Sequence, residues 1–277
     1  MSRTKLLKQL TTPVVASAFL LSLMATHASA QEPLANPQDD RFRLSAGVFS
    51  ASADTTVRLD ADDGTAGTTL SAEDDLGYRD RSELGNVEVE LRLRGRHHVR
   101  FNYWRFDRNA TVVLDEPIQF GDDVYLVNDE VSSGLDVRNF AATYAYDILR
   151  YDRFTLGFGL GVNLLEFRAR AAVPARRVSE EESRTGPIPA ASMQALIRIS
   201  ERFHFEARGE YMNVDIDDYE GSLLNMHAAL LFRFTRNLGV GLGYTSLDHE
   251  VISRNPGDTG ELTLKNNGGE LFLRVAF

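Results

Sequence analysis

The chain has 277 residues, no cysteine, and 40 acidic against 30 basic side chains, which gives a formal net charge of −10. The acidic balance argues against nucleic acid as a partner, and the lack of cysteine excludes a disulfide framework and thiol chemistry. A chain of this length forms one domain or two, and β-barrels of this size are commonly single domains.

The first thirty residues have the parts of a secretory signal peptide. Arg3, Lys5 and Lys8 precede an apolar run from Val14 to Met24, and Ala28-Ser29-Ala30 offers the small residues of a cleavage site. The apolar run is shorter than the about twenty residues of a membrane-spanning helix. We therefore expect cleavage near Ala30 and export of the mature chain.

Most of the remaining sequence alternates apolar and polar side chains. In the segment 84–95, for example, Val87 and Val89 alternate with Glu88 and Glu90. Successive side chains of a strand point to opposite faces, so a period of two predicts β-strands and not helices. We expect ten strands, each long enough to cross a bilayer when tilted, which takes about nine to eleven residues. They lie near 41–51, 84–95, 97–113, 134–149, 153–170, 188–200, 203–214, 223–235, 238–247 and 268–277.

The predicted connections are of two kinds. Short polar turns lie at 95–96, 150–152, 201–202 and 236–237. Between them, long charged connections lie near 52–83, 114–133, 171–187, 215–222 and 248–267. Alternating short and long loops are typical of outer-membrane barrels, which have tight turns on the periplasmic side. Eight or twelve strands remain alternatives, because residues 55–60 and 69–72 of the first long connection are themselves strand-like.

Alternation alone does not show which face of the strands points outward. A soluble lipocalin-like barrel hides its apolar face, whereas a membrane barrel exposes that face to lipid. Aromatic residues at the ends of the apolar faces favour the membrane barrel, because they resemble interfacial girdles. They are Phe42, Phe101, Tyr103, Tyr146, Phe154, Phe203, Phe234 and Phe277.

The chain ends in the apolar face Leu271, Leu273, Val275 and Phe277. A terminal aromatic on such a strand resembles the signal by which the barrel assembly machinery recognises outer-membrane proteins, so Leu273, Val275 and Phe277 are the predicted assembly signal. As a whole the chain resembles the small outer-membrane β-barrel proteins of Gram-negative bacteria, the broad group of OmpA-type and OmpW-type barrels. The resemblance implies an all-β fold, with one antiparallel up-and-down transmembrane barrel in the cell outer membrane. The expected organisation is a signal peptide over 1–30, a short periplasmic segment over 31–40 and a barrel over 41–277.

In a membrane barrel, the polar faces of these strands line a narrow lumen. Charges in a partly desolvated lumen are costly unless they are paired, so we predict a cross-barrel ion-pair network. The predicted members are Glu88, Glu90, Arg92, Arg94, Arg100, Arg198, Glu206, Arg208, Glu210, Arg233, Glu270 and Arg274. Such a network closes the barrel, since about eight to ten strands leave little more than side-chain space. The alternative is a narrow pore for small solutes or ions.

The long connections are acidic, and we expect them to be solvated. The run that starts at Asp60 fails as a calcium loop, because its twelfth residue is Ser71 where a glutamate is needed. No metal site and no cofactor are predicted. The arginines between Arg168 and Arg184 either contact lipopolysaccharide phosphates or pair with glutamates of their own loop.

For catalysis, the chain resembles in size the omptin proteases, which are barrels with Asp-x-Asp and Asp-x-His pairs. Asp248 and His249 are adjacent, so they should point to opposite faces, and Asp60 and Asp62 have no evident partner. No catalytic residue is predicted, and an omptin-like surface hydrolase is kept only as an alternative. The expected protein is a monomeric, non-catalytic barrel with a structural or surface-interaction role. Its expected partners are outer-membrane lipid, lipopolysaccharide and the assembly machinery.

Overall fold

A computed structural model describes residues 36–175, 178–255 and 258–277. The chain divides into two units, Met1–Pro33 and Leu34–Phe277, and the described residues all belong to the second. The predicted signal peptide and most of the predicted periplasmic segment lie outside the described residues. No helix in the described ranges is long and apolar enough to cross a membrane.

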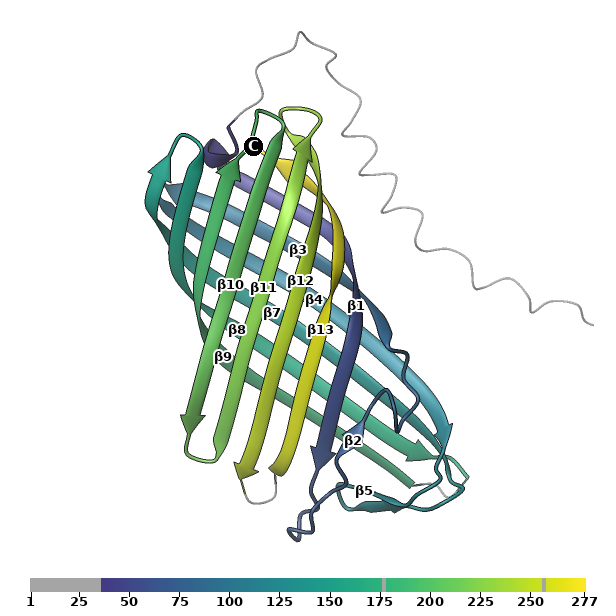
Figure 1. The fold of residues 1–277 in the computed structure, drawn as a ribbon. Coiled ribbons are helices and arrows are strands. Elements are labelled where there is room, and N and C mark those ends of the chain that lie inside the picture. The colour runs from purple at the N-terminus through teal and green to yellow at the C-terminus, as the bar shows by residue number, and fades with distance from the viewer. Residues whose placement is uncertain (1–35, 176–177, 256–257) are drawn as a thin grey trace, which may run out of the picture. The chain divides into compact units, whose positions relative to one another are not determined.

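Ten long antiparallel strands close into one barrel (Figure 1). Each strand pairs with its neighbour in the sequence, and the last strand pairs with the first from Arg43↔Ala276 to Leu59↔Gly260. Closure removes the two edges that an open sheet would leave. The prediction of an all-β, up-and-down barrel of about ten strands is confirmed. The strands are β1 (Phe42–Leu59), β3 (Arg81–Arg94), β4 (His97–Val113), β7 (Glu130–Tyr151), β8 (Phe154–Val173), β9 (Val178–Arg198), β10 (Phe203–Ile216), β11 (Tyr219–Arg233), β12 (Leu238–Asn255) and β13 (Asp258–Ala276).

The strands extend much further from the short turns than the sequence predicted. Three connections predicted to be long, 171–187, 215–222 and 248–267, are mostly strand, and β10 and β11 are joined by Asp217 and Asp218 alone. Asp217 has a φ of 52°, which aspartate tolerates in tight turns. These segments were misjudged because both faces of a strand can be polar beyond the membrane, so the alternation that marks a strand disappears.

Two long connections remain, and both pack into the barrel. Residues 60–80 contain β2 (Leu70–Ser71), and residues 114–129 contain the hairpin of β5 (Ile118–Phe120) and β6 (Asp123–Tyr125). They join a buried apolar cluster with inward-facing strand residues such as Phe106 and Val137. The expectation that these acidic connections are simply solvated is therefore wrong. Their members of the cluster are Leu70, Ala72, Leu76, Tyr78, Leu114, Ile118, Phe120 and Tyr125.

A short 3-10 helix, η1 (Pro37–Asp39), lies at the end of the barrel that carries the short turns (Figure 1). The side chain of Asn36 caps it by accepting a hydrogen bond from the backbone N–H of Gln38. Gln38 and Asp40 are buried, and Arg150 donates to the carbonyl of Gln38 at 3.0 Å. The described part of the predicted periplasmic segment is thus folded against the barrel mouth.

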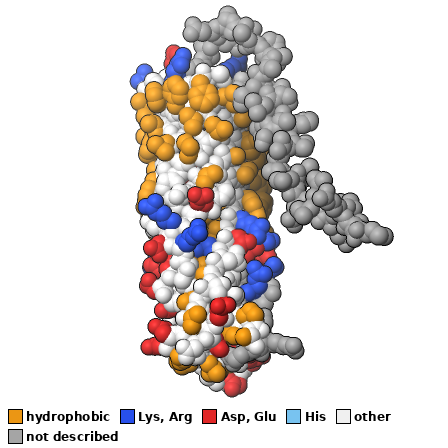
Figure 2. Space-filling view, turned by 90° about the vertical axis from the view of Figure 1, so that its right-hand side faces the viewer, with side chains coloured by type: hydrophobic (Ala, Val, Ile, Leu, Met, Phe, Trp, Pro, Cys, Tyr) orange, Lys and Arg blue, Asp and Glu red, His pale blue; other side chains and the backbone are white. Residues whose placement is uncertain are grey.

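The outer surface of the barrel carries a band of apolar side chains near the short turns (Figure 2). Leu160 on β8 is 72% exposed and Leu242 on β12 is 68% exposed, whereas Asn163 and Leu247, on the other face of the same strands, are buried. A soluble barrel would hide these side chains, so the soluble alternative is wrong. The outward aromatic residues include Tyr103, Phe203 and Phe277, as the girdle prediction required.

Candidate functional site: the charged lumen

The interior of the barrel near the short turns is crossed by ion pairs. They join inward-facing residues of strands that are not neighbours in the sheet as well as residues of adjacent strands. The pairs are Arg43–Glu90 at 2.6 Å, Arg92–Asp147 at 3.2 Å, Arg100–Glu210 at 2.8 Å, Arg208–Glu88 at 2.5 Å, Arg274–Glu206 at 2.6 Å, and Arg233–Asp40. In most of them both side chains are nearly inaccessible to solvent.

The pair of Glu206 and Arg274 bridges strands that are not neighbours in the sheet. Glu206 lies on β10 and Arg274 on β13, and two strands of the sheet separate them. Arg274 donates to both carboxylate oxygens at 2.6 and 2.8 Å, and its Nε donates to Ser45 Oγ at 2.8 Å. Two parallel charge-assisted hydrogen bonds hold both groups in one orientation. This pair therefore ties together two strands that are three positions apart in the ring, whereas Arg208 and Glu88 tie β10 to β3, which lies five positions away.

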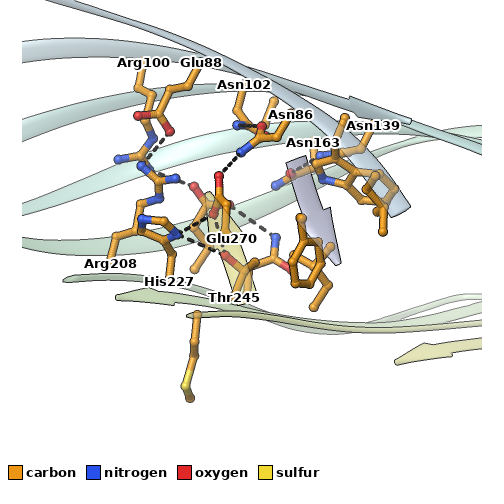
Figure 3. Close-up of a pocket in the computed structure, with 18 residues that line it drawn as sticks. Asn86, Glu88, Arg100, Asn102, Asn139, Asn163, Arg208, His227, Thr245 and Glu270 are labelled. Carbon is orange, nitrogen blue, oxygen red and sulfur yellow. Dashed lines mark hydrogen bonds and ion pairs between the residues drawn. The ribbon is translucent and has the colours of Figure 1, made fainter. Parts of the chain in front are cut away.

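A second polar chain runs through Glu270 (Figure 3). Glu270 accepts hydrogen bonds from Asn86 at 3.0 Å and from Thr245 at 2.9 Å, and it lies 3.1 Å from His227 Nδ1. Asn102 in turn donates to Asn86 at 2.8 Å. The chain links β4 and β3 to β13, β12 and β11, so one carboxylate organises side chains from five strands.

His98 joins two carboxylates closer to the short turns. Its Nδ1 lies 3.0 Å from Glu90, and its Nε2 lies 2.7 Å from Asp147. Both ring nitrogens can donate at once only in the imidazolium form. Since Glu90 also binds Arg43 and Asp147 also binds Arg92, the histidine connects two ion pairs into one cluster.

Ten of the twelve predicted lumen residues face inward: nine of them belong to the six arginine–carboxylate pairs, and Glu270 lies against His227. Arg198 is half-buried on the inner face of β9, opposite His204. The prediction for Arg94 is wrong, because β3 has a bulge there: Arg92 opposes His98 and Arg94 opposes His97. The extra residue, Leu93, shifts the alternation, and Arg94 is exposed at the turn.

The predicted pairing was only partly right. Arg208 pairs with Glu88 and Arg274 with Glu206, but Arg92 pairs with an aspartate, Asp147. Sequence reasoning missed Asp40, Arg43 and Asp147 as partners. Arg43 and Asp147 do follow the inward alternation of β1 and β7, but their inward neighbours are small and weaken the pattern. Asp40 precedes the first strand, so no period marks it.

The network leaves little free space. Two cavities among its side chains have volumes of about 60 Å³ and about 40 Å³. Each has room for a few water molecules at most. Where inward glycines open a gap, other side chains fill it: Asp147 and Gln194 lie against Gly157, and the ring of Phe272 lies against Gly241. Side chains therefore fill most of the lumen at this level.

The residues considered for catalysis and metal binding lie apart. His249 is buried in the lumen and its Nε2 lies 2.7 Å from Asn225 Oδ1, whereas Asp248 lies on the opposite face of β12. In the exposed connection, hydrogen bonds from the side chain and backbone of Thr65 hold the pKa of Asp63 below its usual value. Among the described residues, no group of three or more histidine, aspartate or glutamate side chains is placed to hold a metal ion.

A closed ring of up-and-down strands with an apolar outer band and a charged interior is the fold of an outer-membrane β-barrel. No family model and no curated protein sequence matches the chain. Among solved structures, the outer membrane protease OmpT from Escherichia coli is similar over 90% of this chain and 100% of that chain, with 11% identity and a TM-score of 0.54. At this identity the likeness establishes the fold alone.

Two other outer-membrane proteins are more distantly similar. The translocator domain of the autotransporter NalP from Neisseria meningitidis has 11% identity over 95% of this chain and 97% of that chain, with a TM-score of 0.44. The attachment invasion locus protein Ail of Yersinia pestis has 12% identity over 83% of this chain and 98% of that chain, with a TM-score of 0.34. Neither score supports a structural argument.

Proposed function

We propose that this protein is a closed, non-catalytic outer-membrane barrel with a structural or surface-interaction role. The observation that carries the proposal is the buried pair of Glu206 and Arg274 within a set of six arginine–carboxylate pairs. Removing one partner of a buried ion pair costs about 3–5 kcal/mol. A continuous water path would require several such pairs to separate together, so the closed state is strongly favoured.

The proposal includes a route to the membrane. Signal peptidase would cleave near Ala30, and the assembly machinery would bind the last strand through Leu273, Val275 and Phe277. These side chains point outward, and the ring of Phe277 is 63% exposed, so the signal is accessible. The barrel is closed by a single chain, which supports a monomer.

Lipopolysaccharide is the proposed partner just beyond the apolar band. Arg105 and Arg138 clasp Asp136 at 2.8 and 2.7 Å on the outer face, and Arg168 lies 3.3 Å from Glu166 beside them. The side chains of Arg105 and Arg138 remain 42% and 34% exposed. Arginine binds phosphate groups well, so these side chains suit the phosphate layer of the outer leaflet. The side chains of Arg176, Arg177 and Arg184 lie outside the described residues.

OmpT is an outer membrane protease, and we do not propose proteolysis for this chain. The aspartate–histidine pair that the omptin hypothesis requires would have to share one face of a strand. Here Asp248 and His249 do not, and Asn225 occupies the Nε2 of His249. This arrangement supports a barrel without catalysis.

Conductance of the purified protein in a planar lipid bilayer tests the proposal. We expect the wild-type protein to be silent, because the two cavities among its lumen charges have room for only a few water molecules each. Steady conduction of small ions by the wild type would refute the closed barrel and support the narrow pore. The variant Glu206→Ala sharpens the test, since it should lower thermal stability in a closed barrel but change only ion selectivity in a hydrated pore.

A further inference from the structure

The barrel wall has a gap between β9 and β10. Their pairing runs from Arg198↔His204 to Ala191↔Tyr211 and stops there. Beyond this point β9 stays paired with β8 as far as Val178, and β10 stays paired with β11 as far as Ile216. The two strands therefore continue side by side in sequence order without a shared ladder over residues 186–190 and 212–216.

Two prolines explain where the ladder ends. The backbone N–H of Arg198 donates toward β8, to the carbonyl of Arg153. The N–H groups of even-numbered residues of β9 therefore point toward β8, and those of odd-numbered residues point toward β10. Pro187 and Pro189 are odd-numbered and have no N–H. They remove two consecutive donors that would have bound β10. Apolar side chains, among them Ile188, Met212 and Val214, pack at this place instead.

An apolar chamber lies behind the gap. Its volume is about 470 Å³, within the range of about 300–1,000 Å³ that is typical of ligand pockets. Phe167, Ile188, Met212, Val214, Val251 and Leu262 contribute apolar lining. The charged side chains at its edge compensate one another, since Arg58 lies 3.7 Å from Glu261. The chamber thus offers contact area to hydrocarbon and no free charge to an ionic ligand.

The gap is continuous with the lipid-facing surface. Pro187 lies opposite Leu164 on β8, and Pro189 lies opposite Val162. Leu164 is 42% exposed and Val162 is 36% exposed, and both belong to the apolar outer face. The two prolines are themselves exposed on that face. Hydrocarbon in contact with this part of β8 therefore lies beside the opening.

We propose that the chamber binds one acyl chain of an outer-leaflet lipid, which enters sideways through the gap between β9 and β10. The acyl chain would pass from the bilayer into the chamber without crossing water. Its entry would therefore not require apolar surface to be exposed to water. This inference rests on the proposed membrane location but not on the closed lumen. Conductance and chain binding can therefore fail separately.

Quenching of tryptophan fluorescence by brominated acyl chains tests the proposal. Trp104 is the only tryptophan, so Trp104→Phe gives a silent background in which Phe167→Trp reports from the chamber. The protein is placed in vesicles of phosphatidylcholine brominated on its acyl chains. We expect the chamber reporter to lose most of its fluorescence, as does an outer-face reporter made by Leu160→Trp. Phe120→Trp is a second chamber reporter if the first fails to fold.

A matched pair of glycine substitutions shows where the quencher sits. A side chain at Gly221 enters the chamber without a clash, since a Cβ there is 3.6 Å from Met212 and 3.9 Å from Val214. A side chain at Gly209 projects outward, and its Cβ meets only the carbonyl of Asn225, at 3.8 Å. We expect Gly221→Leu to restore the fluorescence of the chamber reporter and Gly209→Leu to leave it quenched.

Three results would overturn the proposal. The first is a chamber reporter that stays bright in brominated vesicles while the Leu160→Trp reporter is quenched. The second is quenching that Gly221→Leu and Gly209→Leu change equally. The third is quenching by brominated palmitate added to ordinary vesicles but not by brominated phospholipid, which would make the ligand a free fatty acid and not a membrane lipid.

Discussion

Glu206 accepts two hydrogen bonds from Arg274, and both side chains are buried. In Glu206→Ala the guanidinium keeps Ser45 as a partner but loses its counter-charge. We expect the free energy of unfolding to fall by about 3–5 kcal/mol, the cost of leaving a buried charge unpaired. Urea-induced unfolding in detergent micelles, followed by circular dichroism, measures the change.

The exposed pair of Glu220 and Arg254 provides the control for this experiment. Its distance of 2.7 Å matches that of the buried pair, but both side chains are about half exposed. Exposed ion pairs contribute about 0–1 kcal/mol. Equal destabilisation by Glu220→Ala and Glu206→Ala would show that the lumen is as wet as the surface.

Individual lumen residues were predictable where the alternation is regular. Glu206, Arg208 and Glu210 follow one another at a spacing of two, and all three face inward. The prediction that Arg94 faces inward was wrong because the β-bulge is a local feature of the backbone, and the residue types around it do not reveal it. The partners themselves depend on which strands lie opposite across the lumen, and a single sequence does not contain that information.

At the scale of elements, Glu73 fastens the connection 60–80 to the barrel. Its carboxylate accepts from Arg108 Nη1 at 2.6 Å and from the backbone N–H of Thr55 at 2.8 Å. We expect Glu73→Ala to raise hydrogen exchange throughout 60–80, because Arg108 then holds the connection without an ion pair, through the carbonyl of Arg79 and the ring of Tyr78. Mass spectrometry of exchanged peptides gives the readout.

The adjacent residue Asp74 is the matched control, since its side chain is exposed. Asp74→Ala should leave exchange in 60–80 close to that of the wild type. Exchange in β10 to β12 should not change in either variant. A uniform rise across all strands in Glu73→Ala would mean that the residue supports the whole barrel and not one connection.

Replacing the prolines of β9 is expected to raise stability, in contrast to the substitutions above. In the double variant Pro187→Val and Pro189→Val, two N–H donors face β10 again. We expect the ladder to extend and stability to rise by about 0.5–1.5 kcal/mol for each bond formed. Slow exchange of the amides at positions 187 and 189, measured by NMR, would show the new bonds. Rapid exchange at both would mean that something other than the missing donors keeps the strands apart.

The limits of elements were predictable only near the short turns. There, β4 begins at His97 and β12 at Leu238, as the sequence indicated. At the far ends, the solvent on the outside removes the requirement for apolar residues, and β12 continues to Asn255 with Asp248 on its outer face. The inward packing of Leu70 and Tyr78 was missed because charged residues surround them in the sequence.

For the whole molecule, the strand number and closure could be predicted because each strand contributes its own alternation and its own turn. The division of the interior into a charged part and an apolar part could not be predicted. Inward positions such as Glu206 and Arg274 near the short turns carry charge, whereas Phe106 and Val137 further along belong to an apolar cluster. A window of about ten residues reports one face at a time, and this division becomes visible only when the strands are aligned around the ring.

Phe277 links assembly of the whole barrel to a side chain that contributes little to its final stability. The backbone of Phe277 bonds to Arg41 and to Phe42, the first residue of β1, and Phe277→Ala keeps these bonds. Phe277 is 63% exposed, and its ring centroid lies 6.3 Å from that of Phe42. The free energy of unfolding of the assembled variant should therefore lie within about 0.5 kcal/mol of the wild-type value.

The amount of barrel in the outer membrane should nevertheless fall, because the terminal aromatic acts in recognition. Migration of unboiled and boiled membrane fractions in gel electrophoresis separates folded from unfolded chains and measures the amount of assembled barrel, and urea-induced unfolding measures its stability. Leu160→Ala removes an equally exposed apolar side chain elsewhere in the band and should leave abundance unchanged, so a similar loss in both variants would attribute the effect to lipid contact and not to the terminal signal.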